Sequence, residues 1–259
     1  MKSWVESLDP NIISVIIPTF NRENFLSACI ESLKKSDKAS QLDIIVIDDK
    51  SDDYNAANNI KICDNAKQSG VFYNVRLIQL HENTGTVSIP RNIGISHAAG
   101  RTIAPTDDDC MPRNKKFDLF PLLWEKESTV LAYGDRDEYS LDINGDFQFY
   151  RTVKCSQYVS DKKSVGIDNG QFIYKADNYI NVPPIFPINA CDWELYSRFA
   201  EYGDFAYLPL SVCRYYWHNT NISRTPKNMR VDPLKVLPKF MDYFKDGGFK
   251  NACASLLST

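Results

Sequence analysis

Three short runs of apolar, mostly β-branched residues recur in the first half of the chain, and segments with helical spacing separate them. The runs are Ile12–Ile17, Leu42–Ile47 and Val75–Leu80. Runs of this length are typical of strands that are buried on both faces of a parallel sheet. Apolar residues also recur three and four positions apart over 25–33, more weakly over 54–67, and over 88–99. This alternation predicts an α/β fold with a mostly parallel sheet, right-handed crossovers and flanking helices.

The second half of the chain has a looser pattern. Asp142–Gly145 has the composition of a hairpin turn, and Asn181–Pro187 has that of an irregular loop. Helical spacing returns from Asp192 to Tyr202, and a strand is expected at Phe205–Leu210. We therefore expect a smaller part, built from antiparallel strands and loops, to be attached to the sheet.

Helix ends and chain length complete the expected architecture. Asn21 or Asn24 can cap the helix at 25–33, and Gly100 is a natural residue to end the helix at 88–99. The 259 residues, of which 43% are hydrophobic, suffice for one large domain, which we place at 1–224. We expect 225–259 to form a basic, partly helical tail, because it carries six Lys or Arg residues against three Asp.

The segment Arg101–Pro112 carries three successive carboxylates, Asp107, Asp108 and Asp109, after a short apolar stretch. Their mutual repulsion is relieved by a proton, a basic partner or a divalent cation, and hard oxygen ligands suit Mg²⁺ or Mn²⁺. A solvated acidic turn is the alternative. Open α/β sheets bind ligands beyond the carboxyl ends of their strands, so the position of these acids favours a binding site.

The net charge and the spacing of the cysteines indicate which partners and which cellular compartment to expect. The formal charge of −3 gives no electrostatic case for nucleic acid as a partner. Seven scattered cysteines without a CxxC pair indicate reduced thiols, which are typical of the cytoplasm. The first residues carry no apolar signal-peptide core, and no apolar run reaches transmembrane length. Three alternatives stay open for the tail: packing on the domain, contact within a homo-oligomer, or peripheral contact with the cytoplasmic face of a membrane.

Five motifs follow one another in an order and spacing typical of a known family. They are Val15–Arg22, Val46–Ser51, Pro90–Gly94, Gly100–Asp109 and Cys191–Leu195. With them the chain resembles family 2 glycosyltransferases over residues 12–222. The resemblance implies a GT-A fold, with a nucleotide-binding half at 12–112 and an acceptor half at 113–224. It also implies an inverting transferase of polysaccharide biosynthesis, which uses Mn²⁺ or Mg²⁺. Such an enzyme moves a sugar from a nucleotide-diphosphate donor, usually UDP-linked, to a hydroxyl of a glycan or lipid-linked acceptor.

The same resemblance assigns eight residues to the nucleotide-sugar donor. Asp49 would accept a hydrogen bond from the uracil ring, and Arg91 would lie near the diphosphate. Alternatives stay open, because Asp48 and Asp49 can cap the following helix and Arg91 can be a surface residue. In an extended segment Asp108 would point away from its neighbours, as an exposed acid without a role. The full set is Pro18, Thr19, Asn21, Arg22, Asp49, Arg91, Asp107 and Asp108.

The resemblance assigns the metal ion to Asp109, Asp107 and His218. Asp109 is the expected direct ligand, whereas Asp107 can instead hold the ribose or a water molecule on the ion. His218 can join this carboxylate site as a neutral imidazole, or it can be a buried histidine among aromatic residues.

The general base of the family matches Asp192, and Glu194 is the second candidate. Residues two apart on a helix project to different faces, so only one of these carboxylates can deprotonate the acceptor. An ordinary aspartate is ionised at neutral pH and needs no pKa shift for this role. Cys191 stands where the family usually has a Glu. The alternative for Asp192 is a helix N-cap.

Two other functions stay open on the sequence. A sugar nucleotidyltransferase would share the sheet and the metal, although no Gly-rich loop with basic residues follows the first strand. A non-catalytic module that binds a sugar nucleotide or a glycan would not need Asp192. A phosphotransfer receiver is excluded, because the chain is too long and its acid pair follows the second strand instead of the first.

Overall fold

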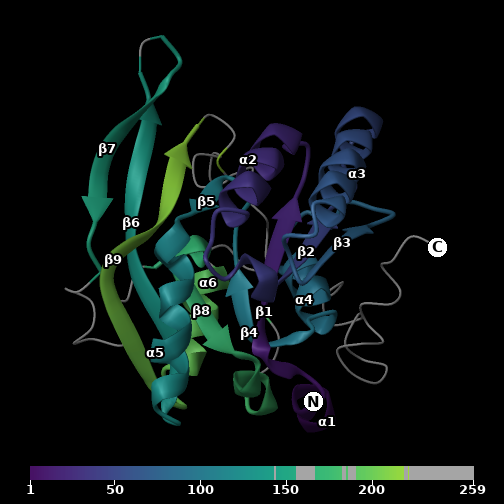
Figure 1. Cartoon of the computed structure of the whole chain (residues 1–259). Helices are drawn as coiled ribbons and strands as arrows, with labels where there is room; N and C mark the ends of the chain where they lie inside the picture. The colour runs from purple at the N-terminus through teal and green to yellow at the C-terminus, as the bar shows by residue number, and fades with distance from the viewer. Residues whose placement is uncertain (143, 156–166, 183–184, 186–190, 219–220, 222–259) are drawn as a thin grey trace.

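The structure is a computed structural model of the whole chain, and it describes all residues except 143, 156–166, 183–184, 186–190, 219–220 and 222–259. The predicted tail at 225–259 and most of the predicted loop at 181–187 lie outside the described residues. The described part of the chain forms one sheet of nine strands with helices packed on both faces (Figure 1).

Four parallel strands form the first half of the sheet, in the order β3, β2, β1, β4. Strand and helix alternate along this part of the chain: β1 (Asp9–Thr19), α2 (Glu23–Leu33), β2 (Leu42–Asp48), α3 (Asp53–Gln68), β3 (Asn74–Gln79), α4 (Ser88–Ser96) and β4 (Gly100–Pro105). The parallel pairing directs the carboxyl ends of these strands to one edge, which lies toward the top of Figure 1. The predicted α/β alternation is confirmed in this half.

The second half of the sheet mixes both strand directions. It contains β5 (Cys110–Pro112), β6 (Thr129–Leu141), β7 (Phe147–Val153), β8 (Phe172–Lys175) and β9 (Asp204–Trp217). β8 pairs antiparallel with β4 and β6, β5 with β9, and β7 with β6. β6 and β9 run parallel, so the antiparallel prediction is wrong for this pair. The helix α6 (Cys191–Phe199) lies between β8 and β9 and returns the chain to the end at which β6 begins.

Short elements complete the described chain. They are α1 (Lys2–Glu6), α5 (Leu119–Glu125) and the 3-10 turns η1 (Ala39–Gln41), η2 (Asn114–Asp118), η4 (Asn169–Gln171) and η5 (Ala176–Ile180). Among the described helices, none is both long enough and apolar enough to span a membrane.

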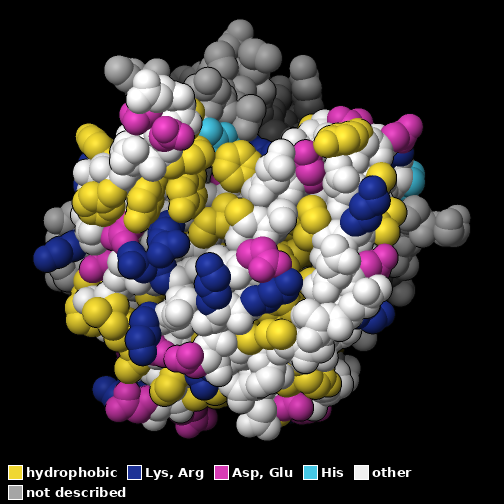
Figure 2. Space-filling model, turned by 45° about the horizontal axis from the view of Figure 1, so that its top comes forward, with side chains coloured by type: hydrophobic (Ala, Val, Ile, Leu, Met, Phe, Trp, Pro, Cys, Tyr) yellow, Lys and Arg dark blue, Asp and Glu magenta, His cyan; other side chains and the backbone are white. Residues whose placement is uncertain are grey.

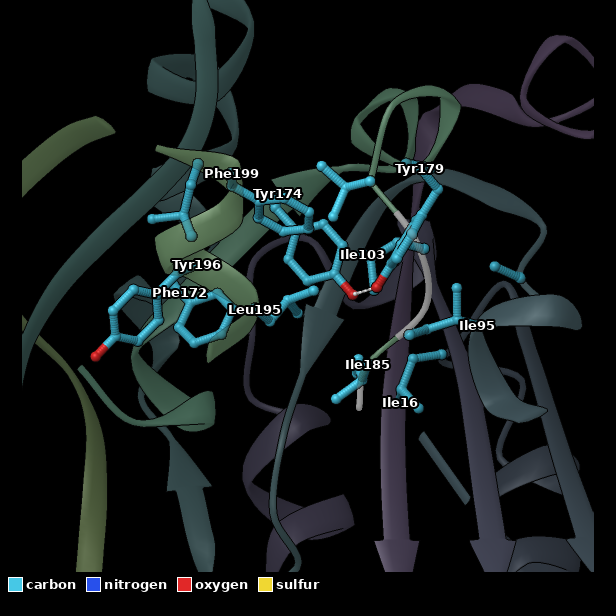
Figure 3. Packing of buried hydrophobic residues seen from close by; sticks show 14 of the residues in the cluster. Ile16, Ile95, Ile103, Phe172, Tyr174, Tyr179, Ile185, Leu195, Tyr196 and Phe199 are labelled. Atoms are coloured by element: carbon cyan, nitrogen blue, oxygen red, sulfur yellow. Dashed lines mark hydrogen bonds between the residues drawn. The ribbon is translucent and has the colours of Figure 1, made fainter. Parts of the chain in front are cut away.

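Side chains of the buried strands alternate between the two faces of the sheet. Val15 and Ile17 pack with α2, α3 and α5, on the near side of the sheet in Figure 1. Ile16 packs on the other face with α4 and α6. All three are fully buried, and burial of a side chain of this size stabilises the fold by about 1.5–3 kcal/mol. Figure 3 shows the second face, where the hydroxyls of Tyr174 and Tyr179 hydrogen-bond at 2.8 Å within an aromatic cluster.

Several helix and strand ends differ from the predicted ones. α4 and α6 end earlier than predicted, at Ser96 and Phe199, whereas β9 extends to Trp217. Gly100 does not end α4. It begins β4, where a Cβ would lie 2.2 Å from the carbonyl oxygen of Ile12. Glycine is therefore required here by the close approach of two backbones.

The predicted cap of α2 is wrong, since the N-cap residue is Arg22, whose side chain makes no capping hydrogen bond. Asn21 has a φ of 53°, and its side-chain oxygen accepts from the backbone N–H of Asp52 at 2.8 Å. Its own N–H donates to the hydroxyl of Ser51 at 2.9 Å. Asn21 therefore ties the loop after β1 to the loop after β2. The predicted turn at 142–145 is confirmed, because it lies between the paired strands β6 and β7.

Candidate active site

The carboxyl edge of the parallel strands gathers the acids that the sequence marks. β1, β2 and β4 end side by side, and Asp107–Asp109 follow β4. The N–H of Cys110 donates to the carbonyl of Asp107 at 3.0 Å and closes a turn, so the three acids are not extended. Figure 2, in which the top of Figure 1 comes forward, shows basic and acidic side chains interspersed on this side of the molecule. The negative charges of the acids on this side are therefore partly balanced by neighbouring Lys and Arg side chains.

Asp108 is buried at the centre of this edge, with 3% of its surface exposed. Its Oδ2 accepts from the hydroxyl of Thr19 at 2.8 Å, and its Oδ1 accepts from Nη1 of Arg22 at 3.2 Å. The expectation of an exposed acid without a role is therefore wrong, because the turn points this side chain toward β1. Burial raises the pKa of Asp108, and the neighbouring charge of Asp109 adds to the shift while Arg22 opposes it.

Asp109 joins the two halves of the sheet. Its Oδ2 accepts from Nη1 of Arg22 at 3.0 Å and from Nδ2 of Asn221 at 3.2 Å, and it lies 3.1 Å from Nε2 of His218. The pairing of β9 with β5 brings His218, which follows β9, back to the acids. The ring of Phe25 stacks on His218, with centroids 4.4 Å apart. His218 is thus a buried histidine that also belongs to the carboxylate site.

Arg91 lies on α4 and is only 3% exposed, so the surface alternative is wrong. Its Nη2 forms an ion pair with Asp107. The side-chain oxygen of Asn169, when the amide is turned toward Arg91, accepts from Nη2 at 2.9 Å and from Nη1 at 3.1 Å. The side chain of Asp107 is 28% exposed, the largest value among the three acids. Asp107 is therefore the acid of the turn that is most accessible to a ligand.

Asp49 organises the next loop along the edge. Its Oδ1 accepts from the N–H of Thr84 at 2.9 Å, and its Oδ2 accepts from the Thr84 hydroxyl at 3.1 Å. The N-cap of α3 is Asp52, which accepts from the N–H of Asn55, so the alternative that Asp48 and Asp49 cap this helix is wrong. Burial raises the pKa of Asp49 to about 7, although the hydrogen bonds from Thr84 oppose the shift. Its charge state therefore changes near neutral pH.

A fully buried lysine supports the strand that leads into the acids. Nζ of Lys116 donates to the carbonyl of Pro105 at 3.2 Å and to the hydroxyl of Thr106 at 2.8 Å. Burial lowers the pKa of Lys116. Lys116 fixes the end of β4 just before the turn, and its charge offsets part of the negative charge of the acids.

Asp192 lies in the first turn of α6 and is partly exposed. The N-cap alternative is wrong, because the helix already begins at Cys191. Desolvation by the surrounding protein raises the pKa of Asp168 to about 7, although 40% of its side chain is exposed; Arg136 opposes the shift, and the charges of Asp192 and Asp107 add to it. The charges of Asp107 and Asp192 are therefore both felt at Asp168. The side chain of Glu194 lies outside the described part of the chain.

Comparison with known proteins decides the family. The family described as "Glycosyl transferase family 2" matches residues 14–201. The chain belongs to this family. Glycosyltransferase GlyG of Streptococcus pneumoniae is 33% identical over 173 residues, which are 65% of this chain and 54% of GlyG. TarS of Staphylococcus aureus, a poly(ribitol-phosphate) beta-N-acetylglucosaminyltransferase, is 29% identical over 163 residues, which are 62% of this chain and 26% of TarS. The aligned part of this chain thus corresponds to about half or less of these relatives.

Solved structures share the fold of this family 2 chain. TarS in complex with UDP-GlcNAc matches with a TM-score of 0.67 at 17% identity, over 93% of this chain and 69% of that one. The mannosyltransferase PcManGT from Pyrobaculum calidifontis, in complex with GDP-Man and Mn²⁺, matches with a TM-score of 0.62 at 12% identity, over 98% and 79% of the two chains. At such identities the likeness shows the fold alone, and it confirms the predicted GT-A fold.

The donor atoms of this family 2 site fit a divalent cation. Among the described residues, no three His, Cys, Asp or Glu side chains are gathered as a ready metal site. Asp109 and His218 nevertheless bring a carboxylate oxygen and an imidazole nitrogen within 3.1 Å of each other, and Mn²⁺ binds atoms of both kinds in proteins. A site with few protein ligands suits a cation that takes its other ligands from the phosphates of a substrate.

The structure brings most of the sequence-predicted residues to one edge. Direct contacts join Thr19, Arg22, Asp108, Asp109 and His218, and an ion pair joins Arg91 to Asp107. Pro18 is buried at the end of β1, and Asn21 and Asp49 lie on the neighbouring loops. Sequence reasoning missed four polar residues, which no periodicity or motif marks: Lys116, Asp168, Asn169 and Asn221.

Proposed function

We propose that this chain transfers a sugar from a UDP-linked donor to a hydroxyl of an acceptor, with inversion at the anomeric carbon and with Mn²⁺ or Mg²⁺ bound. The observation that carries the proposal is the contact of Asp109 with both Arg22 and His218 at the carboxyl edge of the sheet. Acids that are neutralised by cationic side chains at this edge suit a ligand that carries both phosphate and metal. Membership of glycosyl transferase family 2 supports sugar transfer.

Asp49 is the proposed contact for the base. Uracil carries an N–H at ring position N3, and an ionised carboxylate accepts only, so the two groups are complementary. Thr84 and Asn83 hold the carboxylate in place from the adjacent loop. Pro18 and Thr19 would supply backbone contacts beside it. Cytosine has an acceptor at N3, so a cytidine nucleotide is disfavoured.

Cationic side chains and acids would together hold the diphosphate. Arg22 and Arg91 supply fixed positive charge, because each is anchored by a carboxylate of the turn. Asp109, Asp107 and His218 would hold the cation. When bound, a divalent cation neutralises the diphosphate and stabilises its departure as a Lewis acid.

Asp192 is the proposed general base. Asp107 is engaged by Arg91 and Asp109 by Arg22, so the proton of the acceptor must go to another carboxylate. As the acceptor oxygen bonds to the anomeric carbon, Asp192 takes the proton of that hydroxyl, and the bond to the diphosphate breaks on the opposite side. This single displacement inverts the anomeric centre. Glu194 is the second candidate for the base.

The acceptor is proposed as a glycan or a lipid-linked glycan at the cytoplasmic side of a membrane. The name of TarS gives poly(ribitol-phosphate) as the acceptor of that protein, which is consistent with a polymer carrying hydroxyl groups. Membrane contact or oligomer formation through 225–259 stays a prediction, because this segment lies outside the described residues.

Nucleotide binding tests the proposal and its alternatives. Calorimetry with UDP, GDP and CDP, each with and without Mn²⁺, should give the strongest binding for UDP with Mn²⁺. Slow Mn²⁺-dependent hydrolysis of a UDP-sugar should accompany it. Binding without hydrolysis or transfer would favour a non-catalytic module. Release of pyrophosphate from a nucleoside triphosphate and a sugar phosphate would favour a nucleotidyltransferase. If no nucleoside diphosphate binds, the proposal is wrong.

A further inference from the structure

Asp168 is a carboxylate of the site that the proposed transfer has not used. Its Oδ2 lies 2.9 Å from Nη1 of Arg136, and its side chain remains 40% exposed. The same Nη1 donates to Oε1 of Gln171 at 2.7 Å, and that oxygen also accepts from the N–H of Asp168 at 3.0 Å. Gln171 is fully buried and donates to the carbonyl of Gly134 at 2.9 Å. The carboxylate is thus held rigidly at the start of η4.

The loop that carries Asp168 touches both sides of the site. On one side, the next residue, Asn169, accepts from Arg91 when its amide oxygen is turned toward it, and Arg91 is paired with Asp107. On the other side, Phe172 packs edge-to-face against Tyr196 of α6, with ring centroids 6.2 Å apart (Figure 3). Tyr196 lies one helical turn after Asp192. The segment 168–172 therefore contacts Arg91, the partner of Asp107, and the face of α6 that also carries Asp192.

In an inverting transfer the donor sugar lies between the departing diphosphate and the general base. The segment 168–172 contacts the partner of Asp107 and the helix of Asp192, so we place Asp168 beside that sugar. We propose that Asp168 accepts hydrogen bonds from hydroxyl or amide groups of the donor sugar and restricts the donor to neutral sugars. This inference rests on the proposed function and adds the class of the sugar.

The selection against acidic sugars follows from the charges around Asp168. A uronic acid would bring a further carboxylate into a region that already contains Asp107, Asp168 and Asp192. Among the described residues, the cation paired with Asp168 is Arg136, and it is already shared, because its Nε and Nη2 donate to Glu138 at 3.0 and 2.8 Å. Repulsion that the shared Arg136 does not relieve disfavours such a ligand. A neutral hexose or N-acetylhexosamine offers the donors that a carboxylate accepts.

Matched pairs of donors test this inference. The affinities of UDP, UDP-glucose, UDP-N-acetylglucosamine, UDP-galactose, UDP-glucuronate and UDP-galacturonate would be measured with Mn²⁺ by calorimetry. Each uronate should bind about tenfold or more weakly than its neutral counterpart. In Asp168→Asn the affinity for the preferred neutral donor should fall by about tenfold and the gap to the uronate should narrow. The affinity for UDP alone should not change, because UDP lacks the sugar.

A control and a second variant separate recognition from structure. Asp177→Asn alters another Arg-paired aspartate in a 3-10 turn, that of η5, and should leave all affinities unchanged. If Asp168→Asn does not fold, Asp168→Glu keeps the charge but displaces it, and should weaken neutral donors without weakening UDP. A loss of UDP affinity equal to the loss for UDP-sugars would show a structural role and overturn the inference. So would a wild-type preference for a uronate. If UDP itself fails to bind, the proposed function fails as well.

Discussion

Nε2 of His218 lies 3.1 Å from Oδ2 of Asp109, although 109 positions separate the two residues along the chain. The first belongs to the segment after the last described strand, and the second to the turn after β4. The short strand β5 connects them, because it follows the acids directly and pairs with β9. A ligand bound at Asp109 would therefore contact both halves of the sheet.

Asp109→Asn should weaken UDP binding in the presence of Mn²⁺ by about tenfold or more, because an amide is a poorer ligand for a divalent cation than a carboxylate. UDP binding without Mn²⁺ should change little. The fold should persist, since the substitution removes repulsion against the buried Asp108. Calorimetry and thermal unfolding check both statements, with Asp118→Asn as a control at an exposed ion pair in η2. Equal UDP affinities with and without Mn²⁺ in the wild type would contradict it.

UDP binding should weaken as the pH falls below about 7, because burial raises the pKa of Asp49 to about 7 and only the ionised carboxylate accepts from uracil N3–H. Asp49→Asn should bind UDP weakly at alkaline pH and should show a much smaller change on acidification. Titrations with UDP at a series of pH values check this. A pH dependence that is identical in the two proteins would assign it to another group.

The raised pKa of Asp49 has the opposite effect on the stability of the fold, which should decrease as the pH rises. The pKa of Asp49 is raised above its ordinary value of 3.8 in the folded state, so the folded protein binds this proton more tightly than the unfolded chain. Its contribution is present in full at acidic pH and is lost as the pH rises from the ordinary pKa through about 7. Asp49→Asn should therefore remove part of the stability loss between about pH 4 and pH 7. Denaturant unfolding of both metal-free proteins measures the difference, and parallel curves would refute it.

Asp192→Asn should bind the donor with Mn²⁺ as the wild type does, yet transfer sugar on the order of 10²- to 10⁴-fold more slowly. The amide cannot take the proton of the acceptor hydroxyl, whereas donor binding depends on other residues. Single-turnover transfer assays with Asp192→Asn and Glu194→Gln separate the two candidates. Full activity of the first variant and inactivity of the second would reverse the roles. Full activity of both variants would show that α6 does not supply the general base.

Gly100→Ala should destabilise the fold, because its Cβ would lie 2.2 Å from the backbone oxygen of Ile12. Backbone atoms cannot move aside as a flexible side chain does, so we expect a loss of about 3 kcal/mol or more. Gly70→Ala is the matched control, since Gly70 has a φ of +65° and open space around its Cβ position. Its cost should be about 1 kcal/mol, from backbone strain alone. Chemical denaturation that ranks the two variants the other way would contradict the explanation.

Local sequence patterns predicted the first half of the fold well. The spacing of apolar residues, the length of the apolar runs and their alternation with helices together indicate a parallel sheet. Leu42–Ile47 and Ile12–Ile17 are apolar on both faces, and each face is covered by helices as expected. The parallel pairing of β6 and β9 was beyond such reasoning, since it depends on where a distant helix returns the chain.

The residues of the candidate site likewise fall into those that the sequence predicted and those that it did not. Asp107 and Asp109 were marked because acids at a strand end stand out from an apolar background, whereas Arg91, which lies on α4, was marked by the family motif alone. The direction of Asp108 was mispredicted, since a turn and not a strand carries it. Lys116 and Asp168 were missed because each acts through contacts that only the folded chain creates.

Arg22 reaches Asp108 and Asp109 with one nitrogen, at 3.2 and 3.0 Å. The chain therefore brings its own counter-ion to the place where a metal ion is expected. Small domains that depend on a metal to balance their ligands stay unfolded until the metal arrives. A protein whose own arginine balances the charge of these acids is expected to be folded without the metal ion. The metal ion can then bind and dissociate without unfolding the protein. A chelator should inactivate such an enzyme without unfolding it, and adding the cation back should restore its activity.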